Sequence, residues 1–254
     1  MQKPKLQTSN YGISKTENTI IKTIKKNKLV IFTPRELKGL LNYNPTNILQ
    51  QLKRKQIITN LKRNAYTLTE NIKENLFQIS TETINPSYIS FWTALSYYGF
   101  TEQQTQTIQL ITTKQYKSII IKNHKIIPTK FKINRFFAYK KINHFNIAEK
   151  EKAIIDSLAY PNNAGGFNET IKCLKNAWPE INKQKFIEYL KRYNNKALNA
   201  RVGYILEKLK LKKINLEIPT TYTLLNKEKS KTNKLNKEYR IIINEEIAWL
   251  QRKN

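Results

Sequence analysis

A mixed α/β fold of the α+β kind, divided into two domains, is predicted by two features of this 254-residue sequence. Residues 1–80 contain short amphipathic helical patterns, followed by two short apolar runs that a basic turn joins. Residues 85–254 mix alternating apolar runs, which are typical of strands, with longer helical patterns. We therefore expect a small N-terminal domain over 1–80 and a larger α+β domain over 85–254, joined by a polar and partly helical connection.

Two helices are predicted at the start of the N-terminal domain. Isoleucines at 20, 21 and 24 give residues 17–28 one apolar face. A second helix begins after Thr33, because Thr33 and Glu36 have the spacing of a capping box and Pro34 suits the first helical position. Its predicted apolar face consists of Leu37, Leu40 and Leu41.

A third helix is predicted after Asn44 and Pro45, which repeat the start signal. Ile48, Leu49 and Leu52 supply its buried stripe. The polar and basic side chains of the same helix then face outward, and these are Thr46, Asn47, Gln50, Gln51, Lys53 and Arg54.

A basic hairpin follows the third helix. Residues 57–61 and 65–68 read as strands, and Lys62, Arg63 and Asn64 form the turn between them. Helix, turn, helix and basic hairpin together predict a winged helix-turn-helix, which binds double-stranded DNA through base edges and phosphates. The predicted contacts are the six outward residues of the third helix together with Lys62, Arg63 and Tyr66. A protein–protein module of the same fold is the alternative.

The charge balance favours an anionic partner and argues against several enzyme classes. Lys and Arg number 46 against 18 Asp and Glu, a net charge of +28, although the wealth of Lys, Asn and Ile also suits an AT-rich genome. Asp156 is the only aspartate, Cys173 the only cysteine, and His124 and His144 form no ligand pair by spacing. We therefore predict no catalytic residues, no metal site and no cofactor. A nuclease and an RNA-binding module remain as less favoured alternatives.

No signal peptide or long apolar run occurs, so we expect a soluble, cytoplasmic protein.

The larger domain is predicted to contain both helices and strands. The helices are expected at 88–99, 148–160, 167–178, 183–193 and 198–210, and the strands at 107–112, 118–121, 131–133 and 238–244. A turn is expected at 124–128 and an exposed lysine-rich loop at 226–237.

Several residues of the larger domain allow two interpretations. Trp92, Tyr97 and Tyr98 fit a packed core better than a surface for stacking on bases. Asp156 is expected to bind Arg201 or a backbone cap. The acidic residues at 149 and 151 are expected to start a helix and pair with basic neighbours, and Cys173 to be buried. The lysines of the 226–237 loop could hold phosphates or could simply be solvated.

Four sequence blocks, in order, resemble the AbiE-type antitoxin family of viral-defence regulators. The first block is the hairpin at 61–68, where Asn64 stands at a turn position often occupied by glycine, and the second consists of the 88–99 and 111–114 segments. The third is the 147–156 segment, which is similar to the motif A-x-x-E-K-A-[LI]-x-D. The fourth is the 199–207 segment, with a weaker tail at 240–244. Asn can replace glycine in such a turn because it adopts positive φ more readily than most residues.

The resemblance implies a transcriptional repressor that regulates its own operon and an antitoxin-type C-terminal domain. It further implies a toxin-antitoxin or abortive-infection system with a nucleotidyltransferase-like toxin as functional partner, without implying a stable complex. The lysine-rich loop departs from many family members, which leaves a stand-alone winged-helix regulator as the alternative.

Overall fold

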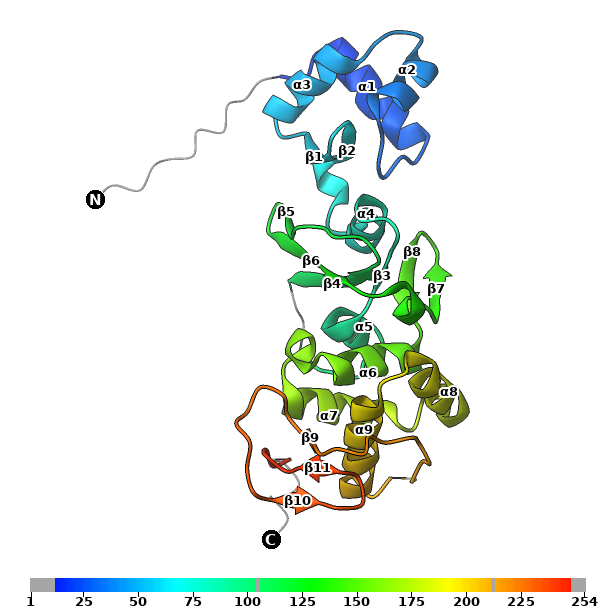
Figure 1. Ribbon diagram of the computed structural model, residues 1–254. Helices are drawn as coiled ribbons and strands as arrows, with labels where there is room; N and C mark the ends of the chain where they lie inside the picture. The colour runs from blue at the N-terminus through cyan, green and yellow to red at the C-terminus, as the bar shows by residue number, and fades with distance from the viewer. Residues whose placement is uncertain (1–11, 104–105, 212, 248–254) are drawn as a thin grey trace, which may run out of the picture. The chain divides into compact units, whose positions relative to one another are not determined.

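The structure is a computed structural model that describes residues 12–103, 106–211 and 213–247. The chain divides into two compact units, Met1–Thr83 and Ile84–Asn254, called unit 1 and unit 2 below. Helices and strands occur in both units, so the α+β class predicted from the sequence is correct (Figure 1). The boundary falls inside the connection predicted between 80 and 85.

Unit 1 contains three consecutive helices, a hairpin and a fourth helix. Its elements are α1 (Lys15–Lys26), α2 (Pro34–Leu41), α3 (Thr46–Arg54), β1 (Ile58–Lys62), β2 (Ala65–Leu68), the 3₁₀ turn η1 (Thr69–Asn71) and α4 (Leu76–Thr83). The inner faces of α1, α2 and α3 and of the hairpin share one core, which includes Ile20, Ile24, Leu37, Leu49 and Leu52. Burial of such aliphatic side chains is the main force that holds short helices of this kind together.

One predicted core position of unit 1 is wrong. Leu37 is fully buried and Leu41 is half-buried, but Leu40 is 46% exposed. Helix α2 buries only one narrow stripe of its surface, and Leu40 lies outside that stripe.

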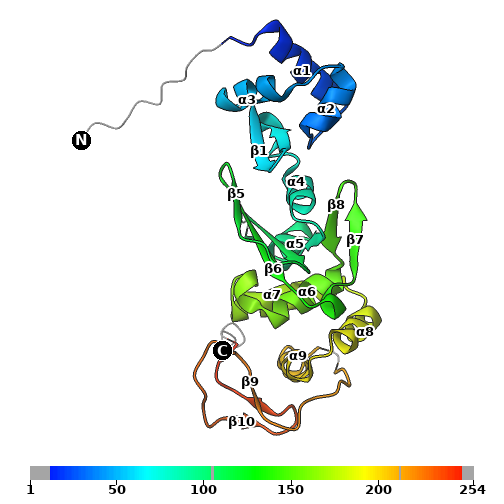
Figure 2. The ribbon, with the colours of Figure 1, turned by 45° about the horizontal axis from the view of Figure 1, so that its top comes forward.

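Unit 2 is built on a six-stranded mixed sheet of order β5-β6-β4-β3-β8-β7. The strands are β3 (Ser87–Ile89), β4 (Thr107–Thr112), β5 (Ile119–Ile121), β6 (His124–Lys130), β7 (Tyr139–Ile142) and β8 (Phe145–Ala148). The central strand β3 pairs antiparallel with β4 and parallel with β8, while β4 and β6 are parallel. Outer hairpins β5–β6 and β7–β8 complete the sheet (Figure 2).

Helices of unit 2 pack below this sheet, and a smaller sheet follows them (Figure 1). The helices are α5 (Phe91–Tyr97), α6 (Lys150–Ala159), α7 (Phe167–Ala177), α8 (Lys183–Tyr193) and α9 (Lys196–Lys208), with 3₁₀ turns η2 (Ile133–Arg135) and η3 (Pro161–Ala164). α6 is buried along nearly its whole length because α5, α7, α8 and α9 all contact it. The small sheet has the order β10-β11-β9, from Leu235–Asn236, Ile241–Ile242 and Thr223–Leu224.

The small sheet and α9 meet at a close contact that only glycine permits. A Cβ atom at Gly203 would lie 2.6 Å from a ring carbon of Tyr239. The absent side chain therefore lets the Tyr239 ring lie against the α9 backbone, and this fixes the segment that carries β11.

Several predicted elements of unit 2 are corrected by the structure. Residues 87–89 form strand β3 before the shorter helix α5, and residues 124–130 form strand β6 where a turn was expected. Residues 131–133 are not a strand, the predicted 238–244 strand is only Ile241–Ile242, and β7 and β8 were not predicted. The predicted helices at 167–178, 183–193 and 198–210 correspond to α7, α8 and α9, with ends within two residues.

Candidate nucleic-acid interface

The turn between α2 and α3 is fixed by local hydrogen bonds. The capping box at α2 is complete: the Thr33 hydroxyl accepts from the Glu36 amide at 3.2 Å, and the Glu36 carboxylate accepts from the Thr33 amide at 2.7 Å. α2 ends at Asn42, whose φ of 59° reverses the chain. Asn44 then accepts from the Thr46 amide at 3.1 Å, and so caps α3 from one position before the N-cap residue Pro45.

α3 has one buried face and one polar exposed face. Leu49 and Leu52 are buried in the unit 1 core. The six side chains predicted to face outward are all exposed, and they are Thr46, Asn47, Gln50, Gln51, Lys53 and Arg54. The Thr46 hydroxyl also donates to Asn44 at 2.7 Å, whereas the other five side chains form no hydrogen bond or ion pair with any described residue.

An ion pair between α1 and the end of α3 holds the helix in place. Lys55 is the C-cap residue of α3, and its ammonium lies 2.7 Å from the carboxylate of Glu17, which is 1% exposed. The same ammonium donates to the Gly12 carbonyl at 3.0 Å. The hydrogen bond from Lys55 lowers the pKa of Glu17 in spite of burial. Lys55 is thus a positioning residue for α3 and is not free for a ligand.

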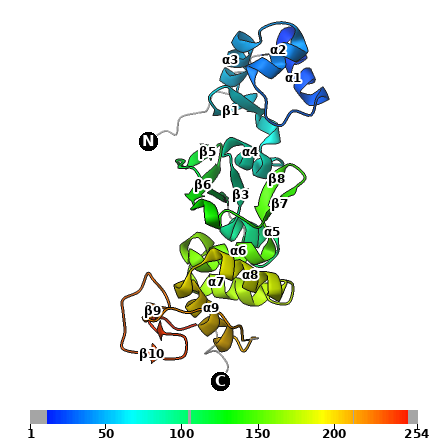
Figure 3. The same cartoon turned by 45° about the vertical axis from the view of Figure 1, so that its right-hand side comes forward.

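The hairpin tip carries a cation, Arg63, that has no ion-pair partner among the residues that the structure describes. Asn64 adopts a φ of 56°, the positive value for which Asn is suited, as the sequence predicted. The Asn60 amide donates to the Lys62 carbonyl at 2.8 Å and to the Ala65 carbonyl at 3.2 Å, and so closes the turn. Arg63 is exposed beside it and has no ion-pair partner in the described chain. α3 and this hairpin lie side by side (Figure 3).

Two predicted contact residues have structural roles. The Lys62 ammonium donates to the carbonyls of Glu82 at 3.1 Å and Thr83 at 3.4 Å, which are the last two residues of α4. Tyr66 is 6% exposed, packs on Phe32 with ring centroids 6.3 Å apart and exchanges two backbone hydrogen bonds with it. Neither residue is presented as a free side chain, because all of β2 is buried and Tyr66 packs on Phe32, while the helix carbonyls attract Lys62.

A shallow hollow of about 300 Å³ connects the start of α2, the start of α3 and the hairpin. Thr46 and Gln50 line it from α3, and Asn64 and Tyr66 line it from the hairpin. Arg35 lines it from the first turn of α2 and is exposed. Sequence reasoning missed Arg35, although its position next to the capping box was visible.

The chain shares its fold with a mycobacterial protein of known structure. The crystal structure of the RV2827C protein from Mycobacterium tuberculosis superposes with a TM-score of 0.67 over 95% of each chain, at 10% sequence identity. This likeness concerns the fold alone, and it spans both units. No protein-family model matches the sequence, and no curated protein matches it either.

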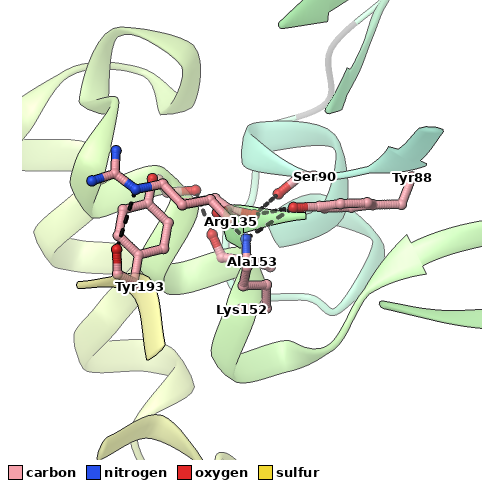
Figure 4. A network of polar contacts seen from close by, with 8 residues as sticks. Tyr88, Ser90, Arg135, Lys152, Ala153 and Tyr193 are labelled. Atoms are coloured by element: carbon pink, nitrogen blue, oxygen red, sulfur yellow. Dashed lines mark hydrogen bonds and ion pairs between the residues drawn. The ribbon is translucent and has the colours of Figure 1, made fainter. Parts of the chain in front are cut away.

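Unit 2 contains a buried polar network that joins α6 to β3 (Figure 4). Lys152 and Asp156 are one helical turn apart on α6, both 0% exposed, and form an ion pair. The Lys152 ammonium also donates to the Tyr88 hydroxyl at 2.9 Å, and Asp156 accepts from Ser90 at 2.9 Å and from Tyr88 at 3.3 Å. Burial lowers the pKa of Lys152 and raises the pKa of Asp156, while their mutual attraction opposes both shifts.

The network corrects the expected pairing of Asp156 with Arg201. Rings of Tyr88, Phe131, Phe137 and Tyr193 surround the Lys152 ammonium at 5.0–5.5 Å. Asp156 is therefore fully used in anchoring α6 to β3, and a role as a metal ligand does not fit its contacts. Among the described residues, no cluster of three or more His, Cys, Asp or Glu could hold a metal ion.

Glu149 and Glu151 stand at the start of α6, as predicted, but only Glu149 pairs with a basic side chain. Glu149 accepts from Lys185 at 3.1 Å and from the Tyr189 hydroxyl at 2.9 Å. Glu151 accepts from the Asn182 amide at 2.7 Å. The basic partner of Glu149 is thus on α8 rather than on α6 itself.

The aromatic residues at the start and end of α5 pack against neighbours as expected, although Tyr97 is 43% exposed. The Tyr98 hydroxyl donates to the Ala148 carbonyl at 2.7 Å, and Tyr97 contacts Tyr98 and Phe145 edge to face. Trp92 is half-buried against Gly165.

Cys173 is buried, as expected, and burial raises the pKa of its thiol to about 12. No helix in the described ranges is both long and apolar enough to cross a membrane.

The lysine-rich loop is exposed and only partly neutralised. Lys229 lies 3.7 Å from Glu245, and Lys234 lies 3.8 Å from Glu246. Lys227 differs from both because it lines a cavity, described below. Surface pairs at such distances contribute little to stability.

Proposed function

We propose that unit 1 is a winged helix-turn-helix that binds double-stranded DNA through α3 and the β1–β2 hairpin. The observation that carries this proposal is the outer face of α3, where amide and basic side chains are exposed and lack partners among the described residues. Polar groups that the fold does not use are available to donate and accept at base edges. The basic hairpin tip beside α3 adds to this argument, because a helix that only faces solvent would not require cations next to it.

The dimensions of α3 suit the major groove. Nine residues correspond to about 13 Å of helix, close to the width of about 12 Å of the groove in B-DNA. In this arrangement Asn47, Gln50 and Gln51 read bases, and Lys53 and Arg54 hold phosphates. Arg63 and Arg35 approach the backbone from the hairpin and from α2.

We extend the proposal to regulation: the protein represses its own operon and acts as the antitoxin of an abortive-infection system against a nucleotidyltransferase-like toxin. The resemblance of four sequence blocks to AbiE-type antitoxins supports this extension, as does the net charge of +28. The 147–156 block of the resemblance coincides with the β8–α6 segment that carries Lys152 and Asp156. The buried ion pair of these two residues is a structural reason for that block's sequence.

Binding of the protein to DNA upstream of its own gene, against scrambled DNA across a salt series, tests DNA recognition. Gln50→Ala is expected to lose about 1–3 kcal/mol of binding free energy on the upstream DNA while leaving binding to scrambled DNA unchanged. Arg63→Ala is expected to weaken both DNAs and to reduce the salt slope by about one.

Lys73→Ala is the matched control, because Lys73 is exposed, carries the same charge and lies outside the hollow and α3. It should leave the salt slope close to that of the wild type. If Lys73→Ala and Arg63→Ala weaken binding equally, the net charge binds the DNA and the proposed surface is wrong.

Co-expression with the product of the neighbouring gene tests the antitoxin role separately. Rescue of growth by the wild type and by Gln50→Ala alike would show that neutralisation does not need base recognition. DNA recognition without any rescue would leave a stand-alone regulator and refute the antitoxin part.

A further inference from the structure

Unit 2 contains an apolar cavity of about 230 Å³ between α6, α7 and α9. Its walls are largely aliphatic and aromatic, and they include Leu158, Phe167, Ile171, Val202, Ile205 and Leu225. An engineered apolar cavity of about 150 Å³ is large enough to bind benzene. This cavity therefore has room for a ligand of several carbon atoms.

A buried cation that has no partner among the described residues lines the same cavity. Arg201 on α9 is 5% exposed, and its Nε and Nη2 atoms are buried without any hydrogen-bond partner in the described residues. No carboxylate of the described chain lies within ion-pair distance of it, and Asp156, the expected partner, is occupied by Lys152, Ser90 and Tyr88. Buried guanidinium groups in folded proteins are almost always paired, because an isolated buried charge is very unfavourable.

The electrostatic environment of the cavity is positive. Burial lowers the pKa of Arg201 to about 10, so the guanidinium still carries its charge at neutral pH. Lys227 also lines the cavity, and its pKa is lowered by burial and then by the charges of Arg201 and Arg135. Glu228 lines the cavity as well, but it forms no ion pair with Arg201.

We propose that this cavity binds a small carboxylic acid with an apolar body, whose carboxylate pairs with Arg201. A planar guanidinium donates two parallel hydrogen bonds to a carboxylate, and the apolar walls would enclose the rest of the ligand. A free phosphate fits less well, because it would leave the apolar walls uncovered. Unit 2 then binds a small acidic metabolite, and this inference does not depend on DNA binding by unit 1.

Calorimetric titration of the full-length protein with octanoate and 4-phenylbutyrate tests the proposal, with the matching alcohols and inorganic phosphate as comparisons. At least one of the two acids should bind, and its alcohol at least about tenfold more weakly, because the charged hydrogen bonds are lost. Phosphate should not compete. Failure of both acids to bind, or equal binding of acid and alcohol, would overturn the proposal.

Arg201→Met gives a second readout that a structural arginine would not give. It should reduce acid binding by at least about tenfold and, without ligand, should leave the protein at least as stable as the wild type, because an unpaired buried charge has been removed. Arg192→Met is the control for acid binding alone, since Arg192 lies on α8 outside the cavity but stacks on the Phe137 ring at 4.2 Å. A destabilised Arg201→Met protein, or one that binds the acids like the wild type, would show that Arg201 is not a ligand-binding residue.

Discussion

Two buried cations in unit 2 have opposite surroundings. Lys152 on α6 is fully buried and has an ion-pair partner, a hydroxyl acceptor and four aromatic rings around it. Arg201 on α9 is nearly as buried, yet two of its nitrogens have no partner in the described chain. A satisfied buried charge anchors the fold, whereas an unsatisfied one is available to bind something from outside.

The same distinction applies to the cations of unit 1. Lys55 and Lys62 donate to groups of the protein itself, while Arg63 and the basic residues of α3 have no such acceptor within the described part of the chain. Removal of a partnered cation, or of its partner, should therefore lower stability, and removal of a free one should lower binding.

The largest expected effect follows from removing the partner of Lys152. Asp156→Ala leaves a buried ammonium without its counter-ion, and we expect a loss of about 3–5 kcal/mol in the free energy of unfolding, measured by urea denaturation. The double variant Lys152→Met/Asp156→Leu, which removes both charges, should recover much of this loss. An Asp156→Ala protein within about 1 kcal/mol of the wild type would break the comparison.

A smaller, pH-dependent effect is expected at the Glu17–Lys55 pair. The hydrogen bond from Lys55 lowers the pKa of Glu17 from its usual 4.5. The contribution of this ion pair to stability is therefore present above pH 4.5 and is lost as the pH falls through the lower, folded-state pKa of Glu17. Glu17→Gln should lower stability at neutral pH by about 1–2 kcal/mol, measured by denaturation across pH. The difference from the wild type should then shrink below about pH 4.5.

Glu74→Gln is the control for this experiment, because Glu74 is exposed and forms no hydrogen bond or ion pair within the described chain. It should leave stability almost unchanged at every pH. A Glu17→Gln deficit that stays constant down to pH 3 would mean that packing, rather than charge, holds α1 to α3.

The smallest effect distinguishes two adjacent residues of the hairpin. Lys62→Met should lower the stability of unit 1 by about 0.5 kcal/mol, because two hydrogen bonds to α4 are lost from an exposed site. Arg63→Met should leave stability unchanged and weaken DNA binding. Thermal denaturation and DNA binding across a salt series, measured on both variants, test this difference. A loss of DNA binding in Lys62→Met together with a loss of stability in Arg63→Met would contradict it.

Elements with local signals could be predicted from the sequence. The Thr33 and Glu36 capping box, the positive φ of Asn64 and the helices α7 to α9 depend on neighbours a few residues away, and the structure contains all of them. Strand β3 was predicted as helix, because its three residues adjoin a true helix and a short apolar run has no decisive period. β7 and β8 were missed because residues 139–142 carry two lysines at a sheet edge.

Pairings between distant residues could not be predicted. Asp156 and Tyr88 are 68 residues apart, and only the packing of α6 on β3 brings them together. Sequence reasoning assigned Asp156 to Arg201 although Lys152, one helical turn away, was the nearer cation. The exposed face of α3 was accessible to prediction because a helix with one apolar stripe must direct its other residues to solvent.

The bond from Lys62 to the end of α4 determines where unit 1 can be cut. A fragment that stops at residue 80, the domain limit predicted from the sequence, would remove both carbonyls that hold the hairpin strand. Its hairpin amides should then exchange with deuterium faster than those of a fragment that runs through Thr83. The last turn of α4 therefore belongs to the smallest piece of the chain in which the proposed reading surface keeps its shape.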